Sequence, residues 1–201
     1  DGSLRQLGRL TPEQAEDIVN ILKNILLCMD KQQMYYFDLK AANIVFNCKD
    51  PKNATIYLAD MASIIPDEDG DYIATHPPPV DAIGSWKAGS RATEGYINIT
   101  YNYHTGKDSE LAQKIYSYQL SLLYIYLITK KEPPTYKSNP TAYFKGVNDF
   151  IRDTVGTTTP GSIDYRIGKD NKYMQVVTNI LNDTKDPKTW TLDNIPLVSE
   201  L

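Results

Sequence analysis

The sequence is poor in the residues that build disulfide or zinc frameworks. Its 201 residues include two cysteines and two histidines. Cys28 and Cys48 fall on a predicted helix and a predicted turn, so no disulfide framework is indicated, and two cysteines cannot complete a structural zinc site. His76 and His104 have no cysteine or carboxylate at metal-ligand spacing. A reducing intracellular compartment, the cytoplasm or the nucleus, fits this composition best.

Long apolar runs and basic stretches are also lacking. The most apolar run, residues 115–128, is interrupted by Ser117, Gln119 and Ser121. It is shorter than the roughly 20 residues that a membrane-spanning helix needs, so we expect a buried core helix and no membrane partner. The 21 Lys and Arg residues are outnumbered by 25 Asp and Glu residues, giving a net charge of −4. No broad basic field results, and nucleic-acid binding is not expected.

A composition of 41% hydrophobic and 23% charged residues excludes a disordered chain and is sufficient for one sizeable core. The segment Thr11-Pro12-Glu13-Gln14 combines an N-cap residue, a helix-starting proline and a capping-box glutamine. It predicts a helix over residues 12–30. The apolar residues of this helix recur every three or four positions and predict one core-facing side. They are Ile18, Ile21, Leu22, Ile25, Leu26 and Met29.

Short β-rich runs follow at residues 34–37, 43–46 and 55–59, and the last two are separated by a turn at 48–53, which predicts a hairpin. Residues 60–103 are rich in proline and glycine and show no periodicity, so we expect a long functional loop. Further helices are predicted at about 108–130, 141–153 and 171–183. This order indicates an α+β domain that is mainly helical.

Four polar residues frame the predicted hairpin. Asp38, Lys40 and Asn43 lie between two strand-like runs, and Asp60 ends the strand-like run IYLAD. We expect these four side chains to converge at one end of the hairpin. One carboxylate that accepts a proton, one ammonium that neutralises a phosphate, and an amide with a second carboxylate that bind Mg²⁺ make a complete set for phosphoryl transfer.

These residues resemble the motifs of the protein-kinase family. Asp38-Leu39-Lys40-Ala41-Ala42-Asn43 matches the catalytic-loop pattern D-L-K-x-x-N, and Leu58-Ala59-Asp60-Met61-Ala62 stands where that family has D-F-G. The resemblance implies a kinase-like C-lobe over residues 1–201. Its parts would be a lead-in helix (1–30), a catalytic loop with a metal-binding hairpin (34–60), an activation-segment-like loop (60–103) and a helical subdomain (108–201).

The resemblance also implies a role for each matching residue. Asp38 would orient the acceptor hydroxyl and take its proton, while Lys40 would contact the γ-phosphate. Asn43 and Asp60 would hold Mg²⁺ or Mn²⁺. Further roles are implied for Val45, under the adenine ring of ATP, and for Thr93, as a substrate-side hydroxyl that bridges the catalytic Asp and Lys. The lysine two places after the catalytic aspartate is typical of kinases that act on serine and threonine.

Several positions depart from the family pattern. Tyr36-Phe37-Asp38 replaces H-R-D, so there is no arginine pocket through which loop phosphorylation could act. Lys114 replaces the aspartate that begins the family's central helix, which leaves the catalytic-loop backbone to find other anchors. Met61 and Ala62 replace the Phe and Gly of D-F-G, which predicts a less mobile Asp60. The family's closing A-P-E reads Asn98-Ile99-Thr100, and its arginine partner would fall near Lys188 or Thr189.

Residues 1–11 contain no glycine-rich phosphate loop and no strand lysine of the kind that an N-lobe supplies. We therefore expect the N-lobe to come from upstream sequence or from a partner chain. Under this hypothesis ATP is the co-substrate and a protein is the acceptor, with a small-molecule acceptor left open. A pseudokinase-like binding module, in which the lobe is kept as a scaffold, is the alternative.

Overall fold

The computed structural model describes most of the chain. The described residues are 2–47, 55–66, 93, 95–96, 108–135, 139–156, 158, 162, 165–183 and 194–201. They form four α-helices and five short strands, so the α+β architecture expected from the sequence is confirmed. The helices are α1 (Pro12–Lys31), α3 (Asp108–Thr129), α4 (Pro140–Thr154) and α5 (Lys172–Asp183).

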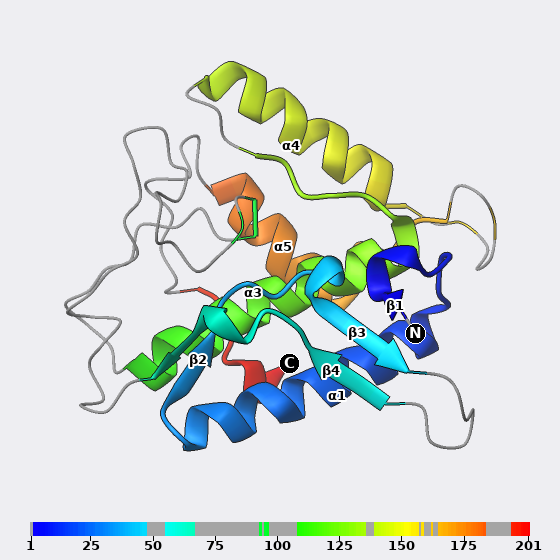
Figure 1. Ribbon diagram of the computed structural model, residues 1–201. Helices are drawn as coiled ribbons and strands as arrows, with labels where there is room; N and C mark the ends of the chain where they lie inside the picture. The colour runs from blue at the N-terminus through cyan, green and yellow to red at the C-terminus, as the bar shows by residue number, and fades with distance from the viewer. Residues whose placement is uncertain are drawn as a thin grey trace.

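Helix α3 forms the centre of the molecule. α1 lies along one side of it and α5 along the other, with α4 beyond α5 (Figure 1). Every residue from 115 to 129 is buried, as predicted for a core helix. The hydroxyls of Ser121 and Thr129 donate to the carbonyls of Ser117 and Ile125, so these buried polar groups are satisfied within the helix. None of the described helices has the length and apolar character needed to cross a bilayer.

Helix α1 begins where the sequence predicts. Thr11 Oγ1 accepts a hydrogen bond from Gln14 N at 3.3 Å, and Gln14 Oε1 accepts one from Thr11 N at 3.1 Å, which completes the capping box. Leu22 and Leu26 are fully buried. The prediction for Ile21 was wrong, because this side chain is 45% exposed. Adjacent helical residues are about 100° apart, so a face centred on Leu22 turns Ile21 toward the surface.

The strands form two small antiparallel sheets. β3 (Ile44–Asn47) pairs with β4 (Thr55–Leu58), which confirms the predicted hairpin, and β1 (Gly2–Ser3) adds to the other side of β3. The turn predicted at 48–53 lies outside the described residues.

The second sheet corrects the prediction that a long loop begins at residue 60. β2 (Met34–Tyr36) pairs with β5 (Ile64–Pro66), which follows a short 3₁₀ helix, η4 (Met61–Ser63). A three-residue strand has too few positions to show a period, and it forms here because β2 supplies backbone partners from a distant part of the chain. Residues 67–92 of the predicted loop lie outside the described part.

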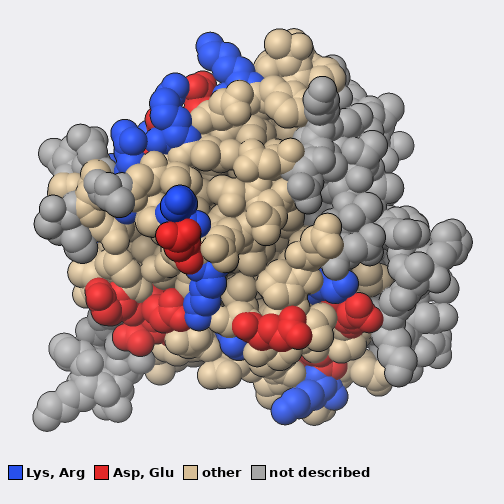
Figure 2. Space-filling view, turned by 180° about the vertical axis from the view of Figure 1, so that it is seen from behind, with Lys and Arg blue, Asp and Glu red and all other residues tan. Residues whose placement is uncertain are grey.

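Charged side chains of both signs are mixed on the surface. On the face turned away from the viewer of Figure 1, Lys and Arg side chains lie among Asp and Glu side chains, and a broad area between them carries neither (Figure 2). The described part of this face therefore presents no continuous field of one sign.

The buried tyrosines of α3 predict unfolding at alkaline pH. Burial raises the pKa of Tyr116 and of Tyr118, so the folded protein keeps both phenolic protons at pH values where the unfolded chain loses them. The free energy of unfolding therefore falls as pH rises above the unfolded value of about 10. Tyr118→Phe is expected to reduce the fall of the free energy of unfolding with pH by about 1.4 kcal/mol per pH unit. Urea denaturation at several alkaline pH values measures this change. An unchanged slope would contradict this assignment.

Candidate active site

The residues of the predicted catalytic loop lie on the connection between β2 and β3. The apolar side chains of Phe37 and Leu39 are buried at 2% and 0% exposure, and they fix the connection to the core. Asp38, between them, is 8% exposed. Lys40 precedes a single 3₁₀ turn, η2 (Ala41–Asn43), which carries Asn43 back toward Asp38. The turn therefore gathers three polar groups on one short segment.

Asn43 holds Asp38 in place. Its Nδ2 donates to the Asp38 backbone carbonyl at 2.9 Å and to Asp38 Oδ2 at 2.6 Å. These bonds fix the orientation of the carboxylate relative to its own backbone. Because the amide nitrogen of Asn43 is used in this way, its oxygen is the atom that could ligate a cation.

Thr93 joins the site from a distant part of the sequence. Its Oγ1 donates to Asp38 Oδ1 and accepts a hydrogen bond of 2.5 Å from Lys40 Nζ. Lys40 Nζ also lies 3.2 Å from Asp38 Oδ2, so the ammonium and the carboxylate form an ion pair that the threonine hydroxyl bridges. The structure thus brings Asp38, Lys40, Asn43 and Thr93 into one connected network.

Asp60 lies next to this network through the backbone of the hairpin. Ala59 N donates to Asn43 O at 2.7 Å, which places Asp60 directly after a residue paired with Asn43. Asp60 has left-handed backbone angles, φ 58° and ψ 58°, a conformation that aspartate adopts more readily than most residues. Its Oδ2 accepts a 2.8 Å hydrogen bond from Ser63 Oγ. The carboxylate is exposed and accessible to a cation.

Tyr36 links β2 to the segment before Asp60. Its hydroxyl donates to the Ala59 carbonyl at 2.7 Å. Burial, with a smaller contribution from the Asp38 charge, raises the pKa of Tyr36, so the phenol stays neutral and remains a donor. Tyr36 therefore positions the segment that leads from the end of β4 to Asp60.

The backbone of the connection between β2 and β3 is anchored to α3 by groups that the sequence did not indicate. Tyr36 N donates to the Tyr116 hydroxyl at 3.0 Å, and Gln119 Nε2 donates to the Phe37 carbonyl at 2.5 Å. Lys114, identified from the sequence at the position of the missing aspartate, pairs instead with Glu110 at 3.3 Å. The sequence predicted that this backbone needs other anchors, and in the structure Tyr116 and Gln119 supply them.

The Tyr116 anchor can be tested by removing one oxygen. Tyr116→Phe leaves the buried Tyr36 N–H without its acceptor, so we expect the free energy of unfolding to fall by about 1–3 kcal/mol. Urea denaturation measures this change. Tyr57→Phe is the matched control, because its side chain is 53% exposed and the expected change is within about 0.5 kcal/mol. Equal losses in the two variants would show that Tyr116 is not an anchor.

Val45 lies on the open face of the three-stranded sheet. Ile44 is fully buried beneath the sheet, so the alternation of side chains places Val45 on the opposite face, where it is half-buried. Its register partners are Tyr57 on β4 and Ser3 on β1. Val45 is therefore not part of the Asp38 network, and it contributes an apolar surface on a neighbouring face.

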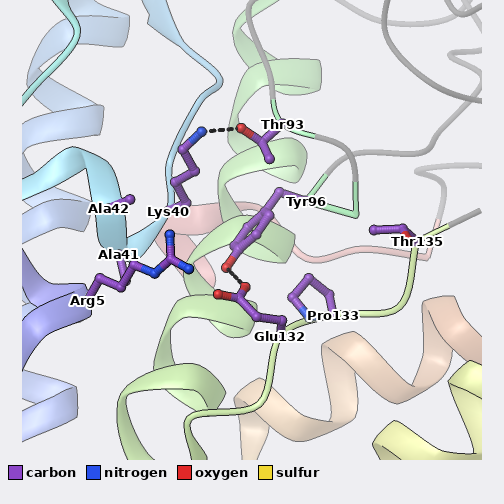
Figure 3. A pocket seen from close by; sticks show the side chains of 9 residues that line it. All are labelled: Arg5, Lys40, Ala41, Ala42, Thr93, Tyr96, Glu132, Pro133 and Thr135. Atoms are coloured by element: carbon purple, nitrogen blue, oxygen red, sulfur yellow. Dashed lines mark hydrogen bonds between the residues drawn. The ribbon is translucent and has the colours of Figure 1, made fainter. Parts of the chain in front are cut away.

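A cavity of about 430 Å³ opens beside Lys40 and Thr93. Figure 3 shows Lys40 and Thr93 at one end of the group that lines it, with Arg5 and Glu132 further away. Tyr96 lies between them, and its hydroxyl donates to Glu132 Oε2 at 2.7 Å. Burial and the Glu132 charge raise the pKa of Tyr96, so this donor stays protonated. The volume is in the range of ligand-binding pockets.

Arg5, Tyr96 and Glu132 were missed as site residues by sequence reasoning. Arg5 lies on a 3₁₀ turn near the N-terminus, η1 (Leu4–Gln6), and Glu132 follows α3. Tyr96 belongs to the loop predicted at residues 60–103, and no local sequence pattern pairs it with Glu132. Asn98, Ile99, Thr100, Lys188 and Thr189, identified with the family's closing motif and its arginine partner, lie outside the described residues.

The two candidate metal ligands, Asn43 and Asp60, do not belong to a larger cluster of acidic or thiolate side chains among the described residues. Among the described residues, no group of three or more His, Cys, Asp or Glu side chains is arranged to hold a metal ion. The pair formed by Asn43 and Asp60 is smaller than such a cluster and consists of hard oxygen donors, which suit a Mg²⁺ ion whose other ligands are water and phosphate oxygens.

No protein-family model matches the sequence, and a comparison with curated proteins yields no match either.

Proposed function

We propose that this chain is the C-lobe of a divergent protein kinase, which transfers the γ-phosphoryl group of ATP to serine or threonine hydroxyls of proteins. The single observation that carries the proposal is the network in which Thr93 bridges Asp38 and Lys40 while Asn43 holds Asp38. An ordinary solvent-exposed turn does not require a hydrogen bond between its aspartate and a threonine 55 residues away.

In this proposal Asp38 is the proton acceptor. The acceptor hydroxyl oxygen attacks the γ-phosphorus, the bond from that phosphorus to the β,γ-bridging oxygen breaks, and ADP leaves. The hydroxyl proton passes to Asp38, whose orientation is fixed by Asn43. Most of the rate enhancement then comes from positioning, because the transition state requires little covalent chemistry from the protein.

Lys40 and Thr93 would act on the transferred group and its acceptor. The Lys40 ammonium, 26% exposed on its side chain, is available to phosphate oxygens on the cavity side. Thr93 keeps that ammonium beside Asp38, so the proton acceptor and the positive charge stay at one point of the site. This arrangement favours an alcohol acceptor that reaches Asp38 from the cavity.

Asn43 and Asp60 would hold Mg²⁺ or Mn²⁺. The backbone hydrogen bond from Ala59 N to Asn43 O keeps Asp60, the residue after Ala59, close to Asn43. An amide oxygen and a carboxylate fit the preference of these ions for oxygen ligands. When bound, the ion supplies charge neutralisation on the β- and γ-phosphate oxygens.

The direct test is phosphate transfer by the full-length protein, with any partner chain that supplies an N-lobe. With γ-labelled ATP and Mg²⁺, label should appear on serine and threonine of protein or peptide acceptors and should disappear when EDTA is added. Absence of transfer to every protein, peptide and alcohol acceptor, despite a folded complete assembly, would overturn the proposal.

A binding module that has lost catalysis is the second candidate function. The observation that favours it is the exposure of two large apolar side chains near the site, Tyr57 at 53% and Met61 at 63%, which offers a surface to a protein partner. A thermal shift of the complete assembly separates the two candidates. A binding module shows no shift at millimolar ATP with Mg²⁺, whereas a kinase is stabilised by its nucleotide.

A further inference from the structure

Arg5 is a cation that lines the cavity beside the proposed catalytic residues. It lines the same cavity as Lys40 and Thr93, and its side chain points toward the Tyr96 and Glu132 side of that space (Figure 3). Among the described residues, no carboxylate forms an ion pair with it. The residue as a whole is exposed, so its charge is accessible to a ligand.

The position of Arg5 is fixed by its surroundings. The preceding residue, Leu4, is 1% exposed and anchors η1 in the core, and Gln6 Oε1 accepts a 2.8 Å hydrogen bond from Ser3 N across the same turn. The guanidinium lies close enough to the Tyr126 hydroxyl to oppose the rise that burial causes in the pKa of that tyrosine. A ligand that binds Arg5 therefore meets a guanidinium whose position is already fixed.

The other charged groups of the cavity already have partners. Lys40 forms an ion pair with Asp38, and one oxygen of Glu132 accepts the Tyr96 hydroxyl. Arg5 and Glu132 line the same cavity, yet they do not form an ion pair with each other. Arg5 interacts with the Tyr126 hydroxyl and with no carboxylate of the described residues, so it is the cavity charge that an anionic ligand can neutralise without breaking an ion pair.

We propose that Arg5 is a specificity-determining residue, whose guanidinium binds a carboxylate or phosphate group carried by a protein substrate close to its acceptor hydroxyl. This inference rests on the phosphotransferase function proposed above. The planar guanidinium fork matches both anions, because it can donate two parallel hydrogen bonds to two of their oxygens. The same charge disfavours a substrate that carries lysine or arginine at that place.

The test compares peptides that share one serine acceptor. The full-length protein is assayed with peptides that carry aspartate, phosphoserine, alanine or lysine at each position around the acceptor. We expect one position at which the acidic peptides have a kcat/KM about 10-fold to 100-fold above that of the alanine peptide, because charge-assisted hydrogen bonds have this strength. The aspartate and phosphoserine peptides distinguish a carboxylate preference from a phosphate preference.

Substitutions then identify the residue responsible. Arg5→Ala should remove the acidic preference mainly by raising KM for the acidic peptides, and Arg5→Lys should restore part of the preference. Arg152→Ala is the matched control, since Arg152 is an exposed arginine on α4 that pairs with Asp149. The preference of Arg152→Ala for acidic peptides should equal that of the wild type.

Failure of this inference is distinguishable from failure of the proposed function. Transfer without any acidic preference, or an acidic preference that survives Arg5→Ala, overturns the role of Arg5 and leaves the kinase proposal standing. A preference for acidic peptides that is lost in Glu132→Gln and kept in Arg5→Ala assigns the selectivity to Glu132. That result also overturns the role of Arg5. No transfer to any acceptor overturns both.

Discussion

Asp38→Asn is expected to lower kcat for phosphate transfer by about 10²–10⁴-fold, the range for loss of a general base. An amide has the size and shape of a carboxylate, and its oxygen can still accept from Asn43, while its NH2 group faces Thr93 Oγ1 and must donate where the carboxylate accepted. The capacity to take the proton of the acceptor hydroxyl is lost. The measurement is steady-state transfer from γ-labelled ATP by the full-length protein at saturating peptide.

The matched control is Asp17→Asn. Asp17 is an exposed aspartate on α1, on the polar side of that helix, and its replacement should leave kcat unchanged. Thermal unfolding of both variants separates lost chemistry from lost structure. A kcat for Asp38→Asn within a few-fold of the wild type, in a folded protein, would remove Asp38 from its proposed role.

Asp60→Asn is expected to raise the Mg²⁺ concentration needed for half-maximal transfer by at least about 100-fold. Loss of a residue that merely supports a metal ligand costs about 10-fold to 100-fold in metal affinity, and loss of a charged ligand should reach or exceed the top of that range. Because an amide still accepts the hydrogen bond from Ser63, the turn at residues 61–63 should persist. A Mg²⁺ titration of the transfer rate measures the change.

Asp170→Asn provides the control for Asp60, since Asp170 is an exposed aspartate far along the chain from the hairpin. Its Mg²⁺ dependence should match that of the wild type. If Asp60→Asn and Asp170→Asn need the same Mg²⁺ concentration for half-maximal transfer, Asp60 is not a Mg²⁺ ligand.

The parts of the fold that depend on local sequence could be predicted. The start of α1 follows from a capping box contained within four residues, and the burial of α3 follows from its apolar composition. The pairing of β3 with β4 follows from two β-rich runs separated by a turn. Each of these signals lies within a single element or between consecutive ones, where periodicity and turn chemistry act directly.

The contacts that position the candidate site depend on distant partners and could not be predicted. Tyr116 accepts from a backbone group 80 residues earlier, and Tyr96 donates to a carboxylate 36 residues later. Arg5 reaches the cavity only because η1 packs beside η2. Such pairs leave no periodic trace, because each side chain is an ordinary core tyrosine or surface charge within its own segment.

The nucleotide complex of the full-length protein tests the central claim most directly. A crystal structure with Mg²⁺ and a non-hydrolysable ATP analogue should show the ion about 2.0–2.1 Å from oxygens of Asn43 and Asp60, with the γ-phosphate facing Lys40. An ion that contacts neither residue, or a nucleotide bound away from the end of the β3–β4 hairpin, would contradict the claim that these side chains form a phosphotransfer site.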